Sequence, residues 1–153
     1  MKTTSKLGLT LIEHYEGCKL KEYLCQAGVP TIGTGHTKGV KVGDVITQDQ
    51  ADKFLSIDLK EAENAVNAQK LDINQAQFDA LVSFTFEEGA GAFAGSTLLK
   101  RIKNKESNTA IADEFAKWNK VKVNGKLIPS DGVIARRKSE FFLFSTGVIK
   151  FFN

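Results

Sequence analysis

The stretch "GCKLKEYLCQAGVPTIGTGHT", residues 17–37, decides how this chain folds. It contains both cysteines of the chain and one of its two prolines, and its glycines interrupt every candidate helix. The β-branched and aromatic side chains between these residues favour short strands. We therefore predict a small antiparallel sheet of two or three short strands over residues 19–43.

A helix is predicted immediately before this stretch, over residues 5–16. Leu11, Ile12 and Tyr15 lie one helical turn apart, and Gly17 follows as a stop signal. Glu16 then lies at the C-terminal end of the helix. The helix dipole is negative at that end and disfavours a charged carboxylate, so the position suits an acid that must donate a proton.

After the stretch, a second pattern predicts a long helix over residues 48–69. Thr47 and Gln50 form a capping box at its start, and apolar side chains then recur at helical spacing. Shorter helical patterns fill the remainder, and Asn124-Gly125 predicts a type I′ hairpin turn. This order of helix, small sheet, long helix and helical remainder indicates an α+β fold.

The composition is that of one globular domain. The 153 residues are 42% hydrophobic and include eleven phenylalanines, which we expect to carry much of the core. Basic and acidic residues are interspersed and the net charge is only +3, which argues against nucleic-acid binding. Two cysteines are too few for a disulfide framework, and with two histidines they form no metal-ligand spacing, so we expect no cofactor.

The N-terminal apolar run is short. It extends from Leu7 to Ile12 and is broken by Gly8 and Thr10, which is too short and too polar for a signal peptide or a membrane span. We therefore expect the protein to begin in the cytoplasm, with no stable membrane insertion.

A second reading of the opening stretch starts from Glu16. Eight residues separate Glu16 from Cys25, and five separate Cys25 from Thr31. This spacing, within "YEGCKLKEYLCQAGVPTIGTGH", resembles the catalytic motif of the phage-type lysozymes, the endolysins of glycoside hydrolase family 24. The segments "FDALVSFTFEEGAGAFAGSTLL", "FAKW" and "GVIARRKSE" resemble further motifs of that family in the same order. The resemblance covers about residues 6–147.

The resemblance implies a lysozyme-like fold. Its parts would be an N-terminal lobe of about residues 1–47 with the small sheet, a connecting helix of about residues 48–69, and a helical lobe of about residues 70–153. Four features depart from the family pattern. Cys25 stands where many members have Asp, Thr34 where many have Tyr, and Glu87-Glu88 where an Asn region is usual. The stretch over residues 124–131 is slightly longer than the family's usual approach to its Arg-Arg pair.

The resemblance also implies roles for the motif residues. Glu16 would be the catalytic acid in a cleft between the lobes. Cys25 would either activate a water molecule or attack the sugar as a thiolate, and the residues leave both roles open. Thr31 would hold the water or position Cys25.

Supporting roles fall to three basic residues. By resemblance, His36 is structural and tethers the sheet. One of Arg136 and Arg137 would pair with Glu16, and because adjacent helical side chains diverge by about 100°, we expect the other to be a surface charge. Cys18 is expected to be a free thiol.

The implied activity is hydrolysis of the β-1,4 bond between N-acetylmuramic acid and N-acetylglucosamine in peptidoglycan, which lyses the host cell. We expect a monomer that waits in the bacterial cytoplasm, until a separate pore-forming protein releases it to the periplasm and cell wall.

Two alternatives remain at this point. A cysteine-dependent amidase or peptidase would use Cys25 as nucleophile and His36 or His14 as base. A non-catalytic wall-binding module would need exposed aromatic platforms, whereas the aromatic residues here fall at core spacing.

Overall fold

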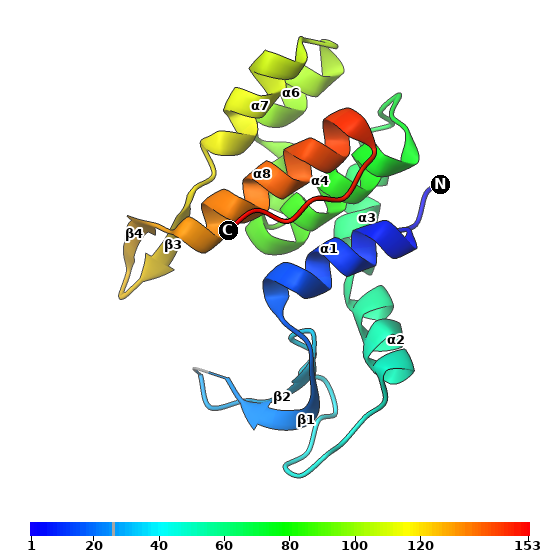
Figure 1. The fold of residues 1–153 in the computed structure, drawn as a ribbon, viewed down its shortest axis with the longest axis vertical. Helices are drawn as coiled ribbons and strands as arrows, with labels where there is room; N and C mark the ends of the chain where they lie inside the picture. The colour runs from blue at the N-terminus through cyan, green and yellow to red at the C-terminus, as the bar shows by residue number, and fades with distance from the viewer. Residues whose placement is uncertain (26) are drawn as a thin grey trace.

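The protein is described by a computed structural model that covers residues 1–25 and 27–153 (Figure 1). Helices dominate, and two separate two-stranded antiparallel sheets interrupt them. The elements in chain order are α1 (Lys6–Glu16), β1 (Lys19–Leu24), β2 (Pro30–Gly33), α2 (Gln48–Asp58), α3 (Lys60–Asn67), α4 (Gln75–Glu88), α5 (Ala90–Ala94), α6 (Thr97–Lys103), α7 (Asn108–Ala116), β3 (Lys120–Val123), β4 (Lys126–Pro129) and α8 (Asp131–Thr146). The predicted α+β class is confirmed.

The predicted N-terminal sheet consists of β1 and β2. Tyr23 pairs with Thr31 and Leu24 with Pro30, so the end of β1 lies beside the start of β2. Isolated bridges from Lys21 to Val45 and from Ile32 of β2 to His36 add to this sheet. The sheet lies at one end of the molecule, away from the helical body (Figure 1).

The predicted first helix is α1, and it ends at Glu16. Gly17 terminates it with a φ of 78° and donates its backbone N–H to the Glu13 carbonyl oxygen. A residue with a side chain is strained at such a φ, whereas glycine is not. Glu16 therefore lies where the chain leaves the helical body for the sheet (Figure 1).

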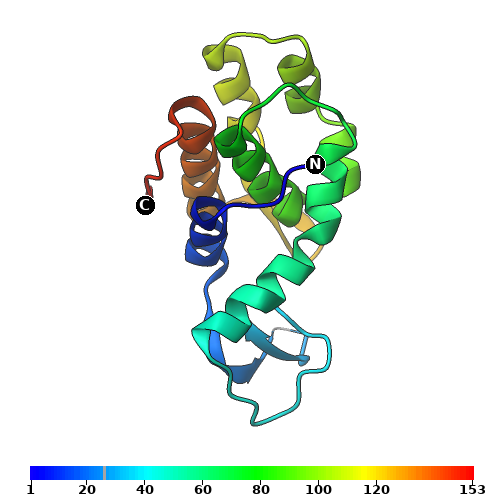
Figure 2. The same ribbon diagram turned by 90° about the vertical axis from the view of Figure 1, so that its right-hand side faces the viewer.

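The predicted single helix over residues 48–69 is wrong in one respect, because it is divided into α2 and α3 at Leu59. The capping box of Thr47 and Gln50 is present at its start. Leu59 is fully buried and has a ψ of −9°, away from the helical value. Its N–H still bonds the Leu55 carbonyl, and its carbonyl accepts from Glu63, so the two helices follow one another as a bent rod (Figure 2).

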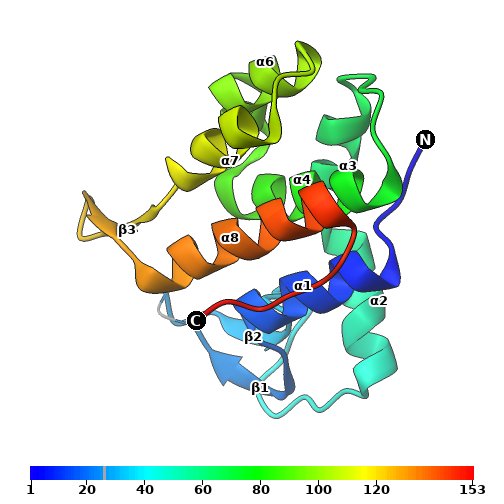
Figure 3. The same ribbon diagram turned by 45° about the horizontal axis from the view of Figure 1, so that its top comes forward.

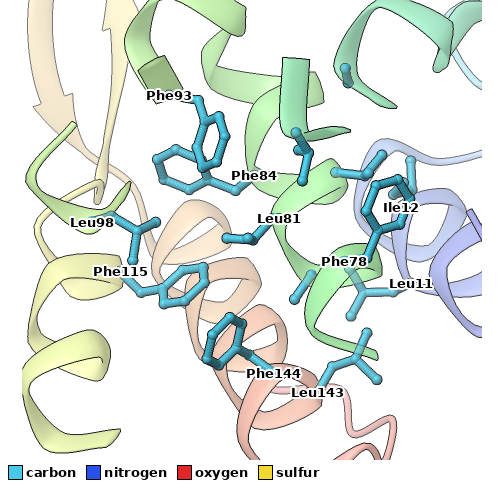
Figure 4. Packing of buried hydrophobic residues seen from close by; sticks show 14 of the residues in the cluster. Leu11, Ile12, Phe78, Leu81, Phe84, Phe93, Leu98, Phe115, Leu143 and Phe144 are labelled. Atoms are coloured by element: carbon cyan, nitrogen blue, oxygen red, sulfur yellow. The ribbon is translucent and has the colours of Figure 1, made fainter. Parts of the chain in front are cut away.

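The core surrounds α4, which packs against α1, α3 and α8. Phenylalanine is prominent there, as the composition predicts. Phe84 contacts Phe93 and Phe115 edge to face, with ring centroids 6.3 and 6.0 Å apart (Figure 4). All three are buried. Offset aromatic contacts of this kind stabilise a core beyond the area they bury.

The predicted hairpin is formed by β3 and β4. Asn124 and Gly125 have φ values of 50° and 80°, as a type I′ turn requires. The hairpin projects from the body, and α8 follows it and runs beside α1 (Figure 3). Within residues 1–25 and 27–153, no helix has the length and apolar character that a membrane span requires.

Candidate active site

Glu16 is bound by Arg136. The Arg136 Nη1 atom donates to Glu16 Oε1 at 2.6 Å. The arginine side chain is 2% exposed and the glutamate side chain 30% exposed, so a buried cation holds an acid that solvent can reach. The geometry identifies Arg136 as the arginine that pairs with Glu16.

The remaining donors of Arg136 fix its guanidinium in the interface of α4 and α8. Its Nη2 donates to the Ser83 carbonyl oxygen at 3.1 Å, and its Nε lies 3.3 Å from Glu140 Oε2. Burial acts to lower the pKa of Arg136, but the carboxylates of Glu140, Glu87 and Glu16 outweigh it and raise the pKa above its ordinary value. Arg136 is therefore a fixed positive charge.

Arg137 is not a surface charge, and that prediction was wrong. Its side chain is only 2% exposed. Its Nη2 donates to Glu87 Oε1 at 2.6 Å and its Nη1 to Glu88 Oε1 at 3.1 Å, while its Nε lies 2.7 Å from Glu140 Oε1. The two arginines diverge around α8, but α4 and α7 pack against neighbouring faces of that helix, so both side chains are enclosed.

The resulting cluster contains more acids than bases. The guanidinium groups of Arg136 and Arg137 are surrounded by four carboxyl groups, those of Glu16, Glu87, Glu88 and Glu140. Burial raises the pKa of Glu88 against the attraction of Arg137, and the neighbouring Glu87 and Glu140 charges raise it further.

Sequence reasoning did not assign Ser83, Glu87, Glu88 or Glu140 to the site. One signal was available: Glu140 follows Arg136 by four residues and Arg137 by three, which places all three on adjoining helical positions. The consecutive acids Glu87 and Glu88 were a second signal, since two adjacent charges in an apolar helix need partners.

Cys25 and Thr31 come together at the end of the N-terminal sheet. Both cysteines of the chain are free thiols, and Cys25 is half-buried. The backbone N–H groups of Val29 and Ala27 lower the pKa of Cys25 below its ordinary value, with a smaller contribution from the Thr31 hydroxyl. Thr31 is 3% exposed, and its Oγ1 donates to the Val29 carbonyl oxygen at 2.8 Å. The turn between β1 and β2 thus places a thiol of lowered pKa, that of Cys25, beside the fixed hydroxyl of Thr31.

His36 connects the sheet to α2. Its Nδ1 lies 2.8 Å from Asp58 Oδ2, and its ring stacks on Phe54 with centroids 4.2 Å apart. Its backbone pairs with Ile32 of β2. The second histidine, His14, stacks on Phe151 of the C-terminal segment. Across the described part of the chain, neither histidine hydrogen bonds to a cysteine, and no group of three potential metal ligands is present.

The contacts therefore arrange the predicted residues in three places. Glu16 and Arg136 meet where α1, α4 and α8 join, Cys25 and Thr31 meet at the turn of the sheet, and His36 lies against α2. The chain leads directly from the end of α1 into β1, so the first two places follow one another along one connected segment.

The chain is also similar to known proteins. The family model described as phage lysozyme matches residues 13–140. The endolysin of Acyrthosiphon pisum secondary endosymbiont phage 1 is 47% identical over 93% of this chain and 97% of its own length.

Two solved structures are similar along nearly the whole chain. An endolysin from Escherichia coli O157:H7 phage FAHEc1 has a TM-score of 0.89 and 37% identity, with 97% of each chain covered. The muramidase domain of SpmX from Asticaccaulis excentricus has a TM-score of 0.85 and 35% identity, covering 95% of this chain and 99% of that one. The family match, the relative and the shared fold together place this chain in the phage lysozyme family.

Proposed function

We propose that this protein is an endolysin that hydrolyses the β-1,4 bond between N-acetylmuramic acid and N-acetylglucosamine in bacterial peptidoglycan. The observation that carries the proposal is the solvent-accessible carboxyl of Glu16, oriented by the buried Arg136, at the end of α1. Similar proteins are described as endolysins and as a muramidase domain, which supports the same activity.

Glu16 would act as the general acid. Cleavage of a glycosidic bond requires a proton on the leaving oxygen as the bond to the anomeric carbon breaks. The 2.6 Å bond from Arg136 holds one carboxyl oxygen of Glu16, and the other can face the substrate. After the proton has left, the same guanidinium stabilises the carboxylate that remains.

Cys25 and Thr31 would act at the anomeric carbon. In one mechanism the Cys25 thiolate takes a proton from a water molecule held by Thr31, and the water oxygen attacks the carbon with inversion. In the other, the thiolate forms a carbon–sulfur bond and water later displaces the sulfur, which gives retention. Both mechanisms need the thiolate, and the lowered pKa of Cys25 increases its fraction near neutral pH.

The cysteine amidase alternative is not favoured. It requires a histidine that can take the proton of Cys25. His36 is instead engaged with Asp58 and Phe54 on α2, and His14 is stacked on Phe151.

The proposal includes action as a monomer, without a cofactor, after a separate pore-forming protein has opened the route from the cytoplasm to the wall. It is tested by producing the protein in a bacterial cytoplasm and following turbidity before and after the inner membrane is permeabilised. Lysis only after permeabilisation supports this route, and lysis without it contradicts the route.

The bond specificity is tested by digesting purified peptidoglycan and identifying the new ends by mass spectrometry. The proposal predicts fragments with new reducing N-acetylmuramic acid ends. Release of free peptides, with the glycan strands intact, would overturn the proposal in favour of an amidase or peptidase.

A further inference from the structure

Glu87 contacts the same arginine nitrogen that binds Glu16. It is the last residue but one of α4, and its Oε2 lies 3.5 Å from Arg136 Nη1, while Glu16 Oε1 lies 2.6 Å from that atom. The other oxygen of Glu87 accepts from Arg137 Nη2 at 2.6 Å. Arg136 Nη1 therefore stands between two carboxyl groups, and Glu87 is anchored from its other side.

The Arg136 guanidinium is fixed in place and cannot turn toward one of the two carboxyl groups alone. Its Nη2 and Nε are engaged by Ser83 and Glu140, and its side chain is 2% exposed. A guanidinium held in this way cannot move toward Glu16 without breaking bonds inside the interface of α4 and α8. The positive charge at Nη1 is thus divided between Glu16 and Glu87.

This division matters for an acid that must carry a proton. An arginine that binds a single carboxylate stabilises the charged form of that group, which has no proton to donate. Around Glu16, the cluster holds the two guanidinium groups of Arg136 and Arg137 and the three carboxyl groups of Glu87, Glu88 and Glu140, so the carboxyl groups outnumber the cations. Negative charge near a carboxyl group favours the protonated form of that group.

We propose that Glu87 is a positioning residue for the reaction. By sharing Arg136 with Glu16, Glu87 allows the arginine to orient the Glu16 carboxyl group while that group keeps the proton that it donates. The inference rests on the proposed function, because it assigns Glu87 an effect on the general acid of that same site. Glu87 itself is not required to touch the substrate.

The test is the pH dependence of kcat/KM on purified, solubilised peptidoglycan fragments for wild type, Glu87→Gln and Glu88→Gln. Both substitutions remove one negative charge from the cluster, but only Glu87→Gln removes the competitor for Arg136. We expect Glu87→Gln to move the alkaline limb of the profile toward lower pH by about one unit. We expect Glu88→Gln to move it by less than half as much.

A structural role alone would lower the whole profile without moving the limb, so thermal unfolding is measured for each variant at each pH. If Glu87→Gln does not fold, Glu87→Asn provides a second neutral amide for the same comparison. The inference would be overturned if the alkaline limb moved equally in the Glu87 and Glu88 variants. It would also be overturned if the limb did not move in the Glu87 variants. If wild type produces no new reducing ends, the proposed function has failed instead.

Discussion

Arg136 Nη1 and Glu16 Oε1 lie 2.6 Å apart, although 120 residues separate them in the chain. The contact is part of a wider docking of α1 on α8, because the preceding residue, Tyr15, bonds the Ala135 carbonyl through its hydroxyl at 3.3 Å. Two consecutive residues of one helix thus meet two consecutive residues of the other. The position of Glu16 is therefore set by the packing of the two helices as well as by its own ion pair.

The burial of Arg137 gives a prediction on stability. Replacing it with Met leaves Glu88 without its buried partner charge and leaves Glu87 and Glu140 with Arg136 alone. We therefore expect the free energy of unfolding to fall by about 3–5 kcal/mol. Lys138→Met, on the exposed side of the same helix, should change stability by less than about 0.5 kcal/mol. Chemical denaturation of both variants measures this. A cost below about 1 kcal/mol for Arg137→Met would show that the cluster contributes little.

The surroundings of Cys25 give a prediction on thiol reactivity. In a Cys18→Ser background, the rate of alkylation of Cys25 followed against pH should give a pKa below the ordinary value of a cysteine, because the N–H groups of Val29 and Ala27 favour the thiolate. Thr31→Val should raise that pKa by removing the hydroxyl. A Cys25 that titrates at or above the ordinary value in the parent would contradict this account of the turn.

The same turn predicts an order of activities. Cys25→Asp keeps an anionic group at the position and should retain peptidoglycan hydrolysis, whereas Cys25→Ala should lose most of it. Turbidity loss of outer-membrane-permeabilised cells, repeated with Cys18→Ala as the control, measures this order. Full activity of Cys25→Ala would remove Cys25 from the mechanism.

Glu13 gives a prediction on pH and stability. Burial raises its pKa to about 7, and the hydrogen bond and charge of Asp52 on α2 act in the same direction. The pKa of Asp52 is in turn lowered, chiefly by that hydrogen bond. The folded state therefore holds a proton on Glu13 that the unfolded chain releases near its ordinary pKa of 4.5. The stabilisation of the fold by this proton is complete below about pH 4.5 and is lost as the pH rises through about 7.

Glu13→Gln keeps a donor toward Asp52 at every pH. We expect its unfolding temperature to fall less than that of wild type between about pH 5 and about pH 8. Glu61→Gln, an exposed glutamate on α3, should follow wild type across this range. If the unfolding temperatures of Glu13→Gln and wild type changed with pH in parallel, Glu13 would not hold the proton.

Local signals in the sequence were enough to predict several elements. The capping box of Thr47 and Gln50 and the turn at Asn124-Gly125 were correct, because neighbouring residues alone determine such features. The division of the long helix at Leu59 was not predicted. Its backbone conformation belongs to a fully buried residue at the joint of α2 and α3, where tertiary packing rather than helix propensity decides.

The candidate site was predicted in part. The spacing of Glu16, Cys25 and Thr31 selected these residues as candidates, and the structure brings the last two together. The choice of Arg136 as the partner of Glu16 and the burial of Arg137 depend on how α8 docks between α4 and α7. Charged residues in a sequence are usually solvated, so the buried cluster became visible only with the fold.

The most direct test of the central claim, that Glu16 is the general acid, is the rate at which Glu16→Gln releases new reducing ends from purified peptidoglycan. The amide can still accept the bond from Arg136, so the fold should persist. We predict a rate lower by about 10²–10⁴-fold, with Glu13→Gln on the same helix close to wild type. Cleavage by Glu16→Gln at a rate near that of wild type would contradict the account.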